Sequence, residues 1–256
     1  MSDIEVSIIG CGPAAMMIAH ACDQHGVNFR LYGPGTPSFI SGAQYLHSDV
    51  GVRYDGLRPE TVRYRRIGTE AGYEAKIYGK LPENMQTSWS KFKEEVEAWP
   101  LIGIYQFLFS KFYDKISRIE VTLEQVLELG ERTLTFNTAP LPALMPDATY
   151  EVERVAILNG HSTAPPMTIV YNGDPEEPWY RMSNLWSSQS IEYPHDFATD
   201  AFLTEDPNVT VVKKPLRTDA FIPNVILSGR YGRWEKGVLV DESYYQAIEA
   251  IRNAAP

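Results

Sequence analysis

Two glycines near the N-terminus have the spacing that most clearly predicts a ligand site in this chain. Gly10 and Gly12 stand between an apolar run, 4–9, and a second apolar stretch that ends at Gly26. This order predicts a strand, a tight turn at Gly10 and a helix, with Gly12 letting a pyrophosphate approach the backbone. The N-terminus of that helix would present unpaired N–H groups to the phosphates. The sequence therefore predicts a dinucleotide site, and a structural turn without a ligand is the alternative.

The residues around these glycines fit the same motif in part. Pro13 and Ala14 open the helix, and the small Ala15 allows the helix to pack closely on the strand. After the second predicted strand, 27–32, no carboxylate follows in 33–35. An acidic residue usually holds the adenosine ribose at that point. We expect backbone groups to hold the ribose instead.

Composition and charge exclude several classes of protein. The 256 residues are 44% hydrophobic and 22% charged, which is ordinary for a soluble globular chain, and no apolar run is long enough to span a membrane. A net charge of −10 opposes broad binding to nucleic acid but leaves room for a local basic surface. Cys11, Cys22 and the five histidines show no metal-ligand spacing. We expect a cytoplasmic protein with free thiols and no metal site.

Two later segments resemble parts of the flavin amine oxidases and UDP-galactopyranose mutases. Residues 121–144 contain a strand that ends in Asn-Thr-Ala-Pro-Leu-Pro, and residues 224–239 contain Ser-Gly-Arg followed by a glycine-rich stretch. In those families the second segment brings Gly-Arg to the pyrophosphate of FAD, and a helix then starts beneath the isoalloxazine ring. The resemblance implies FAD as the cofactor, with NAD(P) as the alternative. The predicted cofactor-binding residues are Gly10, Gly12, Pro13, Ala14, Ala15, Val121, Gly229, Arg230, Gly237, Val238 and Leu239.

Physical chemistry supports two of these assignments separately. Arg230 follows a buried apolar strand, where a cation is costly unless an anion such as pyrophosphate meets it. A surface ion pair is the alternative. A helix predicted over about 240–251 would point its N-terminus at the flavin and stabilise the negative charge of its reduced form. A plain C-terminal helix that closes the sheet is the other interpretation.

The predicted fold class is α/β, with a Rossmann-like FAD-binding domain and an inserted α+β substrate domain that contains a largely antiparallel sheet. Apolar spacing predicts helix over 84–116, interrupted at Pro100, and alternation predicts the strands of the sheet over 150–215. The discontinuous FAD-binding domain is assigned to 1–50, 115–148 and 216–256, and the substrate domain to 51–114 and 149–215.

The candidate catalytic residues lie in the segment 42–47. In the mutases and amine oxidases this region folds onto the reactive face of the flavin. The resemblance makes His47 a candidate proton carrier or donor to a flavin carbonyl, and Gln44 and Tyr45 candidates for positioning substrate. A structural histidine in a loop is the alternative.

Two further groups are candidates for substrate binding. The basic stretch that contains Arg63, Arg65 and Arg66 could hold a phosphate-bearing or nucleic-acid substrate, or could be a solvated face. A second segment resembles the substrate-facing aromatics of the mutases, although ordinary sheet packing explains it nearly as well. Its candidates are Tyr171, Trp179, Tyr180 and Arg181.

Segments 42–47 and 229–234 together resemble compact bacteriophage flavoproteins, some of which act in pathways that modify thymidine in DNA. This resemblance implies a FAD-dependent oxidoreductase that oxidises a C–N bond of an amine or amino-acid-type substrate. A small-molecule amine or an amino-acid-modified thymidine would be the substrate, and nucleic acid stays an open partner. The alternatives are a mutase-like flavoenzyme without net redox change and a non-catalytic flavin-binding subunit. The oligomeric state is left open.

Overall fold

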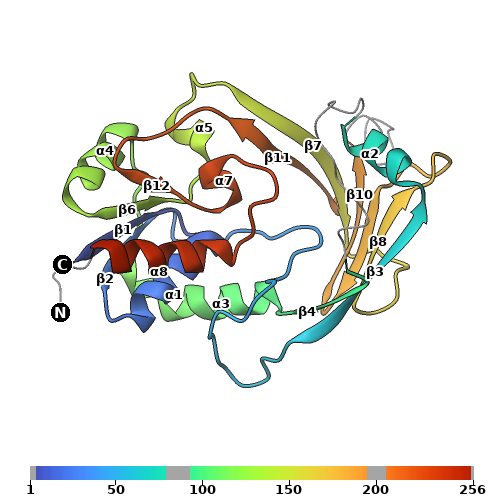
Figure 1. Ribbon diagram of the computed structural model, residues 1–256, viewed down its shortest axis with the longest axis horizontal. Helices are drawn as coiled ribbons and strands as arrows, with labels where there is room; N and C mark the ends of the chain where they lie inside the picture. Colours follow the sequence, from blue (N-terminus) through green and yellow to red (C-terminus); the bar gives the residue numbers. More distant parts are fainter. Residues whose placement is uncertain (1–3, 79–92, 195–205, 255–256) are drawn as a thin grey trace.

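Two β-sheets organise the computed structural model, which describes residues 4–78, 93–194 and 206–254 (Figure 1). The first has five strands in the order β12-β6-β1-β2-β5, and the second has seven in the order β11-β7-β10-β9-β8-β3-β4. Helices accompany the first sheet, whereas the second curves away on the other side of the molecule (Figure 1). The predicted α/β fold class is confirmed.

The five-stranded sheet is parallel throughout. The predicted strand, turn, helix and strand at its centre are confirmed as β1, helix α1 (Pro13–Gln24) and β2. In this arrangement the carboxyl ends of all the strands meet at one edge, where α/β proteins bind their ligands. The strands are β1 (Glu5–Ile9), β2 (Asn28–Tyr32), β5 (Ile116–Ser117), β6 (Leu134–Asn137) and β12 (Val225–Leu227).

Helices cover both faces of the parallel sheet because its central strand is apolar on both sides. Val6 and Ile8 of β1 pack in one cluster with α1, α3 (Leu101–Lys111) and α8 (Glu242–Ala254). Ile9 packs in another cluster with α4 (Leu123–Arg132) and α5 (Leu141–Leu144). Thr122 starts α4 with a capping box to Gln125. The short helices η2 (Tyr113–Lys115) and α7 (Gly229–Arg233) complete this half.

The seven-stranded sheet is antiparallel except where β3 pairs with β8, which confirms the predicted, largely antiparallel sheet. Helix α2 (Glu70–Tyr78) packs on it beside β8. We call inner the face on which Tyr73 of α2 and Tyr45 of the segment 42–47 pack. The strands are β3 (Glu60–Gly68), β4 (Glu95–Ala98), β7 (Tyr150–Asn159), β8 (Thr168–Gly173), β9 (Arg181–Leu185), β10 (Ser188–Pro194) and β11 (Val209–Thr218).

The helix predicted over 84–116 is wrong just before Pro100, where 95–98 form a strand. Residues 79–92, which include Trp89 and Phe92, lie outside the described residues. Val96 belongs to strand β4, opposite Val62 of β3, and the helix begins only after Pro100. Pairing with β3 therefore decides the structure where the helical spacing was ambiguous, because propensity yields to tertiary contacts.

The structure also bears on the predicted division into domains. Helix α3 falls in the segment 51–114 that was assigned to the substrate domain, yet Ile104 and Leu108 pack in the same cluster as α1. The exact boundaries stay a prediction. Among the described residues, no helix is long and apolar enough to span a membrane.

Candidate cofactor and substrate site

The glycine turn between β1 and α1 contains two glycines that are required for different reasons. Gly10 has φ of +111°, and a Cβ there would lie 2.3 Å from Thr138 Oγ1, so the fold itself requires glycine. Gly12 has φ of −78° and ψ of −177°, and a Cβ there would meet nothing closer than Ser38 Oγ at 3.6 Å. Neither backbone nor packing explains the glycine at 12. Close approach of a pyrophosphate is the reason that the motif predicts for a glycine at this position.

The other predicted cofactor segments converge on this turn. Gly229, at the start of α7, has φ of +68° and would place a Cβ 2.5 Å from Ala14 Cβ at the start of α1. The backbone N–H of Ser228 donates to Asn137 O at 2.9 Å. The carboxyl ends of β1, β6 and β12 and the N-terminus of α1 therefore form one edge, as the order of the three segments indicated.

Several buried polar atoms near this edge have no hydrogen-bond partner among the described residues. Buried polar groups are normally paired, so such a set is what a polar ligand would satisfy. Ser243 belongs to the same region because its Oγ is 3.6 Å from the Cβ position of Gly229. The unpaired atoms are Asn137 Oδ1, Ser228 Oγ, Arg230 Nε, Asp241 Oδ1 and Ser243 Oγ.

Arg230 reaches from α7 toward the second sheet. Its Nη2 donates to Pro215 O of β11 at 3.3 Å, and its buried Nε is one of the unpaired atoms. Burial lowers the pKa of Arg230, and Tyr231 and Glu153 oppose that shift. None of the ion pairs within the described ranges includes Arg230. The surface ion pair that was the alternative for Arg230 is therefore not formed among the described residues, and contact with a pyrophosphate stays a prediction.

The remaining predicted cofactor residues differ in their surroundings. Val121 packs in the apolar cluster of Ile9. Gly237 is exposed with φ of +86°, and Val238 and Leu239 are half-buried in the same loop. Their contact with a cofactor stays a prediction.

Helix α8 begins at Glu242, close to the predicted start, but its first turn is acidic. Asp241 precedes it with its side chain buried and accepts a hydrogen bond from Ser48 Oγ. Two carboxylates at this N-terminus already offset the positive end of the helix dipole. If a reduced flavin lay at this N-terminus, α8 alone would stabilise its negative charge less than the sequence suggested.

The segment 42–47 crosses from the parallel sheet to the inner face of the second sheet (Figure 1). Tyr45 packs on that face, and its hydroxyl contacts the hydroxyl of Tyr64. His47 is exposed, with its ring 4.4 Å from that of Tyr45 between centroids. Gln44 is exposed and donates to Ser41 O of its own loop at 2.9 Å. Of the three candidates, only Tyr45 lies on the inner face.

A buried group of charges lies on the inner face, centred on Glu192 of β10. Arg181 Nε donates to Glu192 Oε1 at 2.7 Å, and Lys214 Nζ donates to Glu192 Oε2 at 2.6 Å. Tyr180 donates to Glu192 Oε2 at 2.8 Å and accepts from Lys214 at 3.0 Å. The Glu192 side chain is 1% exposed. Burial alone would raise its pKa, but Arg181 and Lys214 together hold that pKa well below its ordinary range.

Tyrosines extend this group across the sheet. Tyr171 of β8 stands opposite Arg181 in the register, with its ring 6.0 Å from that of Tyr64 and 5.3 Å from that of Tyr73. Burial raises the pKa of Tyr171 to about 12, so its hydroxyl stays protonated at neutral pH. Trp179, by contrast, packs with Val170 in a separate cluster. The predicted substrate residues Tyr171, Tyr180 and Arg181 therefore meet, and Trp179 does not join them.

The three arginines of β3 do not form one patch. Side chains alternate between the faces of a strand, so Arg63 and Arg65 lie on the face opposite to that of Tyr64 and Arg66. Arg63 also forms an ion pair with Glu95 at 3.0 Å. The structure thus divides the basic stretch that the sequence presented as continuous.

Several residues at the site were not singled out from the sequence. Lys236 is the most informative, because it follows α7, where its backbone N–H donates to Leu216 O, and its Nζ lies 3.7 Å from Glu153 Oε2. Burial lowers the pKa of Lys236 to about 8, and Glu153 opposes the shift. The central Glu192 was also missed. The alternation of side chains along 188–194 would have placed Glu192 on the inward face of its strand. It would not have shown that Arg181 lies beside it, because that depends on the register with the neighbouring strand.

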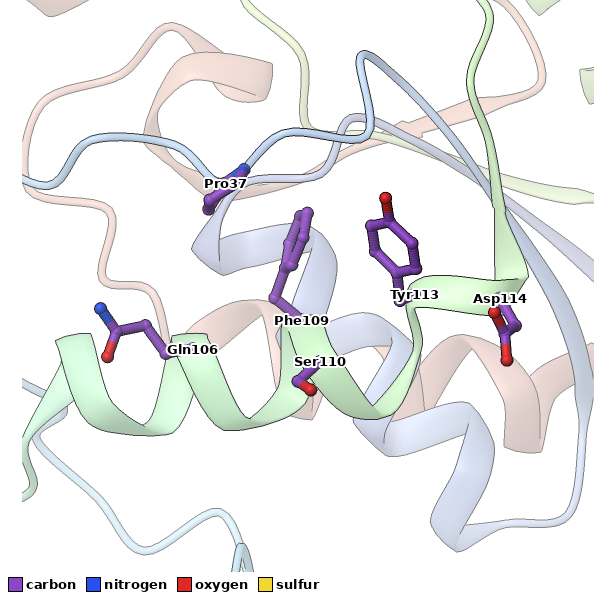
Figure 2. A pocket seen from close by; sticks show the side chains of 6 residues that line it. All are labelled: Pro37, Gln106, Phe109, Ser110, Tyr113 and Asp114. Carbon is purple, nitrogen blue, oxygen red and sulfur yellow. The ribbon is translucent and has the colours of Figure 1, made fainter.

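The region after β2, where the usual carboxylate is missing, packs against α3. Tyr105 donates to Cys11 O at 3.0 Å and accepts from the Ser38 N–H at 2.6 Å. Beside it lies a hollow of about 410 Å³ between α3 and the loop that carries Pro37. Figure 2 shows Phe109 pointing from its helix toward Pro37, with the ring of Tyr113 standing beside it. The residues that line the hollow are Pro37, Gln106, Phe109, Ser110, Tyr113 and Asp114.

Several solved structures share the overall fold of this chain. The chain is similar to reduced UDP-galactopyranose mutase, with 13% identity and a TM-score of 0.58 over 98% of this chain and 95% of the other. A tryptophan 6-halogenase from Streptomyces toxytricini has 12% identity and a TM-score of 0.56, covering 100% of this chain and 73% of its own. A flavoprotein/dehydrogenase from Cytophaga hutchinsonii has 10% identity and a TM-score of 0.54, with coverages of 99% and 80%.

The sequence matches no protein-family model and no curated protein sequence. At identities of 10–13% the structural likeness shows the fold and nothing finer. That fold is the one of FAD-binding, Rossmann-like flavoproteins.

Proposed function

We propose that this protein is a FAD-dependent oxidoreductase that oxidises a C–N bond of an amine or amino-acid-type substrate. The observation that carries the cofactor is Gly12, where glycine serves neither the backbone nor the packing. It stands at the N-terminus of α1, where a pyrophosphate would meet unpaired N–H groups. The unpaired Asn137 Oδ1, Ser228 Oγ and Arg230 Nε at the same edge fit a large polar ligand.

Different segments of the chain would bind different parts of FAD. The turn at Gly10 and Gly12 and the start of α1 would hold the pyrophosphate, with Arg230 as the cationic partner. The loop 33–38 and the hollow beside Tyr113 would take the adenosine end, where Asp114 is the carboxylate among the lining residues. The segment 235–241 would lie along the flavin end.

The inner face of the second sheet supports oxidation of an amine. Tyr45, Tyr64 and Tyr171 give an aromatic, largely buried surface, and burial raises the pKa of each hydroxyl. Such a dry surface favours a neutral amine over its ammonium form. Bound FAD would supply acceptance of a hydride from the carbon beside the amine nitrogen, so that the substrate would become an imine that water hydrolyses, with dioxygen as the final acceptor of the two electrons.

The cofactor is tested first. Purified protein should carry FAD at a ratio of one to one and release it into the supernatant on acid precipitation, because no residue lies in a recognised flavin-attachment motif. Colourless protein whose spectrum does not change with added FAD would refute the proposal.

The reaction is tested by anaerobic mixing with panels of primary amines and amino acids. An amine oxidase bleaches the flavin absorbance without any added reductant, and admission of air restores it. A flavin that stays oxidised with every compound would overturn C–N oxidation.

A mutase-like reaction is the second candidate, favoured by the structural likeness to reduced UDP-galactopyranose mutase. Such an enzyme needs its flavin reduced beforehand and gives no net redox change. Turnover of a sugar nucleotide only after reduction with dithionite would support it. A non-catalytic flavin-binding subunit would respond in neither experiment.

An amino-acid-modified nucleotide in DNA is a more specific version of the substrate. If phosphates of a polymer contribute to binding, affinity falls with salt at a log–log slope of about −0.7 to −0.9 for each phosphate contact. The division of Arg63 and Arg65 from Arg66 weakens this version, since the three arginines lie on two faces. Oxidation of the free compound with no salt slope would remove nucleic acid from the proposal.

A further inference from the structure

A row of aromatic rings connects the glycine turn to the hollow between α3 and the loop that carries Pro37. Tyr105 and Phe109 of α3 and Tyr113 of η2 are four residues apart, a spacing that places side chains on one face of a helix. Tyr105 donates to Cys11 O, inside the turn. The ring centroids of Tyr105 and Phe109 are 5.9 Å apart, and those of Phe109 and Tyr113 are 6.0 Å apart. The row therefore runs from the predicted pyrophosphate position to the hollow.

Tyr113 stands at the end of this row with its ring held from one side. Arg118 Nη2 donates to Tyr113 Oη at 2.5 Å, and the guanidinium carbon lies 4.7 Å from the ring centroid. Tyr113 is nevertheless 39% exposed, and it lines the hollow of about 410 Å³ (Figure 2). An aromatic ring that is held in place and still exposed is a preorganised surface for a planar group.

Gly35 explains why Arg118 can lie against this ring. A Cβ at Gly35 would be 2.8 Å from Arg118 Cγ, and its φ of +70° disfavours other residues. The segment 33–35 is also where an acidic residue usually binds the adenosine ribose. In this chain a side chain at position 35 would displace Arg118. The missing carboxylate and the positioned Tyr113 are therefore two consequences of one local arrangement.

We propose that Tyr113 stacks on the adenine base of FAD, with Arg118 as the residue that positions it. The guanidinium covers one face of the ring, and the base takes the other. Stacking on an aromatic side chain favours binding of a base because every base has a π face. The ligand rests on the proposed function, but the inference goes further. It makes stacking at Tyr113, in place of the usual ribose carboxylate, a source of preference for FAD over FMN.

The experiment titrates the full chain, stripped of flavin, with FAD and with FMN, which lacks the adenosine monophosphate half. We expect FAD to bind more tightly than FMN. Tyr113→Ala should weaken FAD binding by roughly tenfold, the size of one base–aromatic stack, and leave FMN affinity unchanged. Tyr113→Phe keeps the ring and should retain the FAD affinity.

Arg118 is tested through its effect on Tyr113. Arg118→Ala should lower FAD affinity by a smaller factor than Tyr113→Ala and leave FMN affinity unchanged, because the ring is present but no longer held. Arg118→Lys should restore part of that loss through its remaining cation. Phe221→Ala is the matched control for the loss of an exposed ring, since Phe221 is 70% exposed and lines a different hollow with Met145. It should change neither affinity.

Three results would overturn the inference. They are equal affinities of the wild type for FAD and FMN, an unchanged FAD affinity in Tyr113→Ala, and an equal loss for both flavins in that variant. The last of these would assign Tyr113 to the fold.

Failure of the proposed function looks different. Calorimetry with ADP tests the adenine site without any flavin. Binding of ADP that depends on Tyr113, in a protein that takes up neither FAD nor FMN, would keep the adenine site for a free nucleotide and reject the flavin cofactor. FAD binding that depends on Tyr113, without bleaching by amines, would keep the stack and reject amine oxidation.

Discussion

The edge of the parallel sheet and the inner face of the second sheet, the two places proposed for ligands, are built in opposite ways. At the edge, backbone groups form the proposed site: the turn at Gly10 and Gly12 and the N-terminus of α1. On the inner face, charged side chains form it: Arg181 and Lys214 around the buried Glu192. Binding at a backbone site is weakened by any added side-chain volume. The stability of a buried group of charges is lowered when one of its charged partners is removed. Mutations at the two places should therefore fail for different reasons.

The largest effect is expected from Glu192→Gln. This change leaves Arg181 and Lys214 buried without their counter-ion, which costs about 3–5 kcal/mol when one partner of a buried pair is removed. Urea unfolding should show this loss directly. Glu176→Gln, at an exposed position, should change stability by less than about 0.5 kcal/mol. Equal stabilities of the two variants would show that the inner face does not depend on its charges.

The two glycines of the turn should separate folding from binding. Gly10→Ala is expected to destabilise the fold by about 1–3 kcal/mol, because it forces a side chain into positive φ and against Thr138 Oγ1. Gly12→Ala should unfold like the wild type but weaken FAD binding by roughly tenfold or more, since the methyl group occupies the space for the pyrophosphate. Both are measured by thermal unfolding of apoprotein and by flavin titration. Unchanged FAD affinity in Gly12→Ala would remove the main support for the cofactor site.

Arg230 links the two regions, and its loss should affect the cofactor more than the fold. Arg230→Met removes a charge-assisted contact worth about 1.5–3 kcal/mol, or roughly tenfold or more in FAD affinity. Arg233→Met on the same short helix is the matched control, because Arg233 is already paired with Glu235. If both variants retained FAD equally, Arg230 would belong to the contact with Pro215 and not to the pyrophosphate.

The same contrast explains what could be predicted from the sequence. The edge was predictable because its elements are local: Gly10, Gly12 and Ala15 act through spacing within one strand and helix. The inner face was only partly predictable, because Glu192, Arg181 and Lys214 come from three strands whose register the sequence does not give. The helix predicted through Val96 failed for the same reason, since only the pairing with Val62 selects strand there. Arg63 and Arg66 look equivalent in the sequence, but residues three apart in one strand lie on opposite faces of the sheet.

The smallest effect, and the sharpest test of the inner face, is the pH dependence of stability in urea unfolding. Among the described residues, the charged groups that act on Lys236 include Glu153 on β7, Lys214 on β11, Arg181 on β9 and Arg230 on α7. The two arginines stay protonated between pH 6 and 9. Burial lowers the pKa of Lys236 from 10.5 to about 8, so the folded protein loses this proton at a lower pH than the unfolded chain does. The cost of the buried charge is therefore fully present at pH 6–7 and is relieved above pH 8, so the free energy of unfolding should rise by about 1 kcal/mol by pH 9. Arginine stays charged throughout, so Lys236→Arg should flatten the profile, and any slope that remains would report Lys214, whose pKa burial also lowers. A wild-type profile that rises no more than that of Lys236→Arg would show that Lys236 keeps its proton over this range.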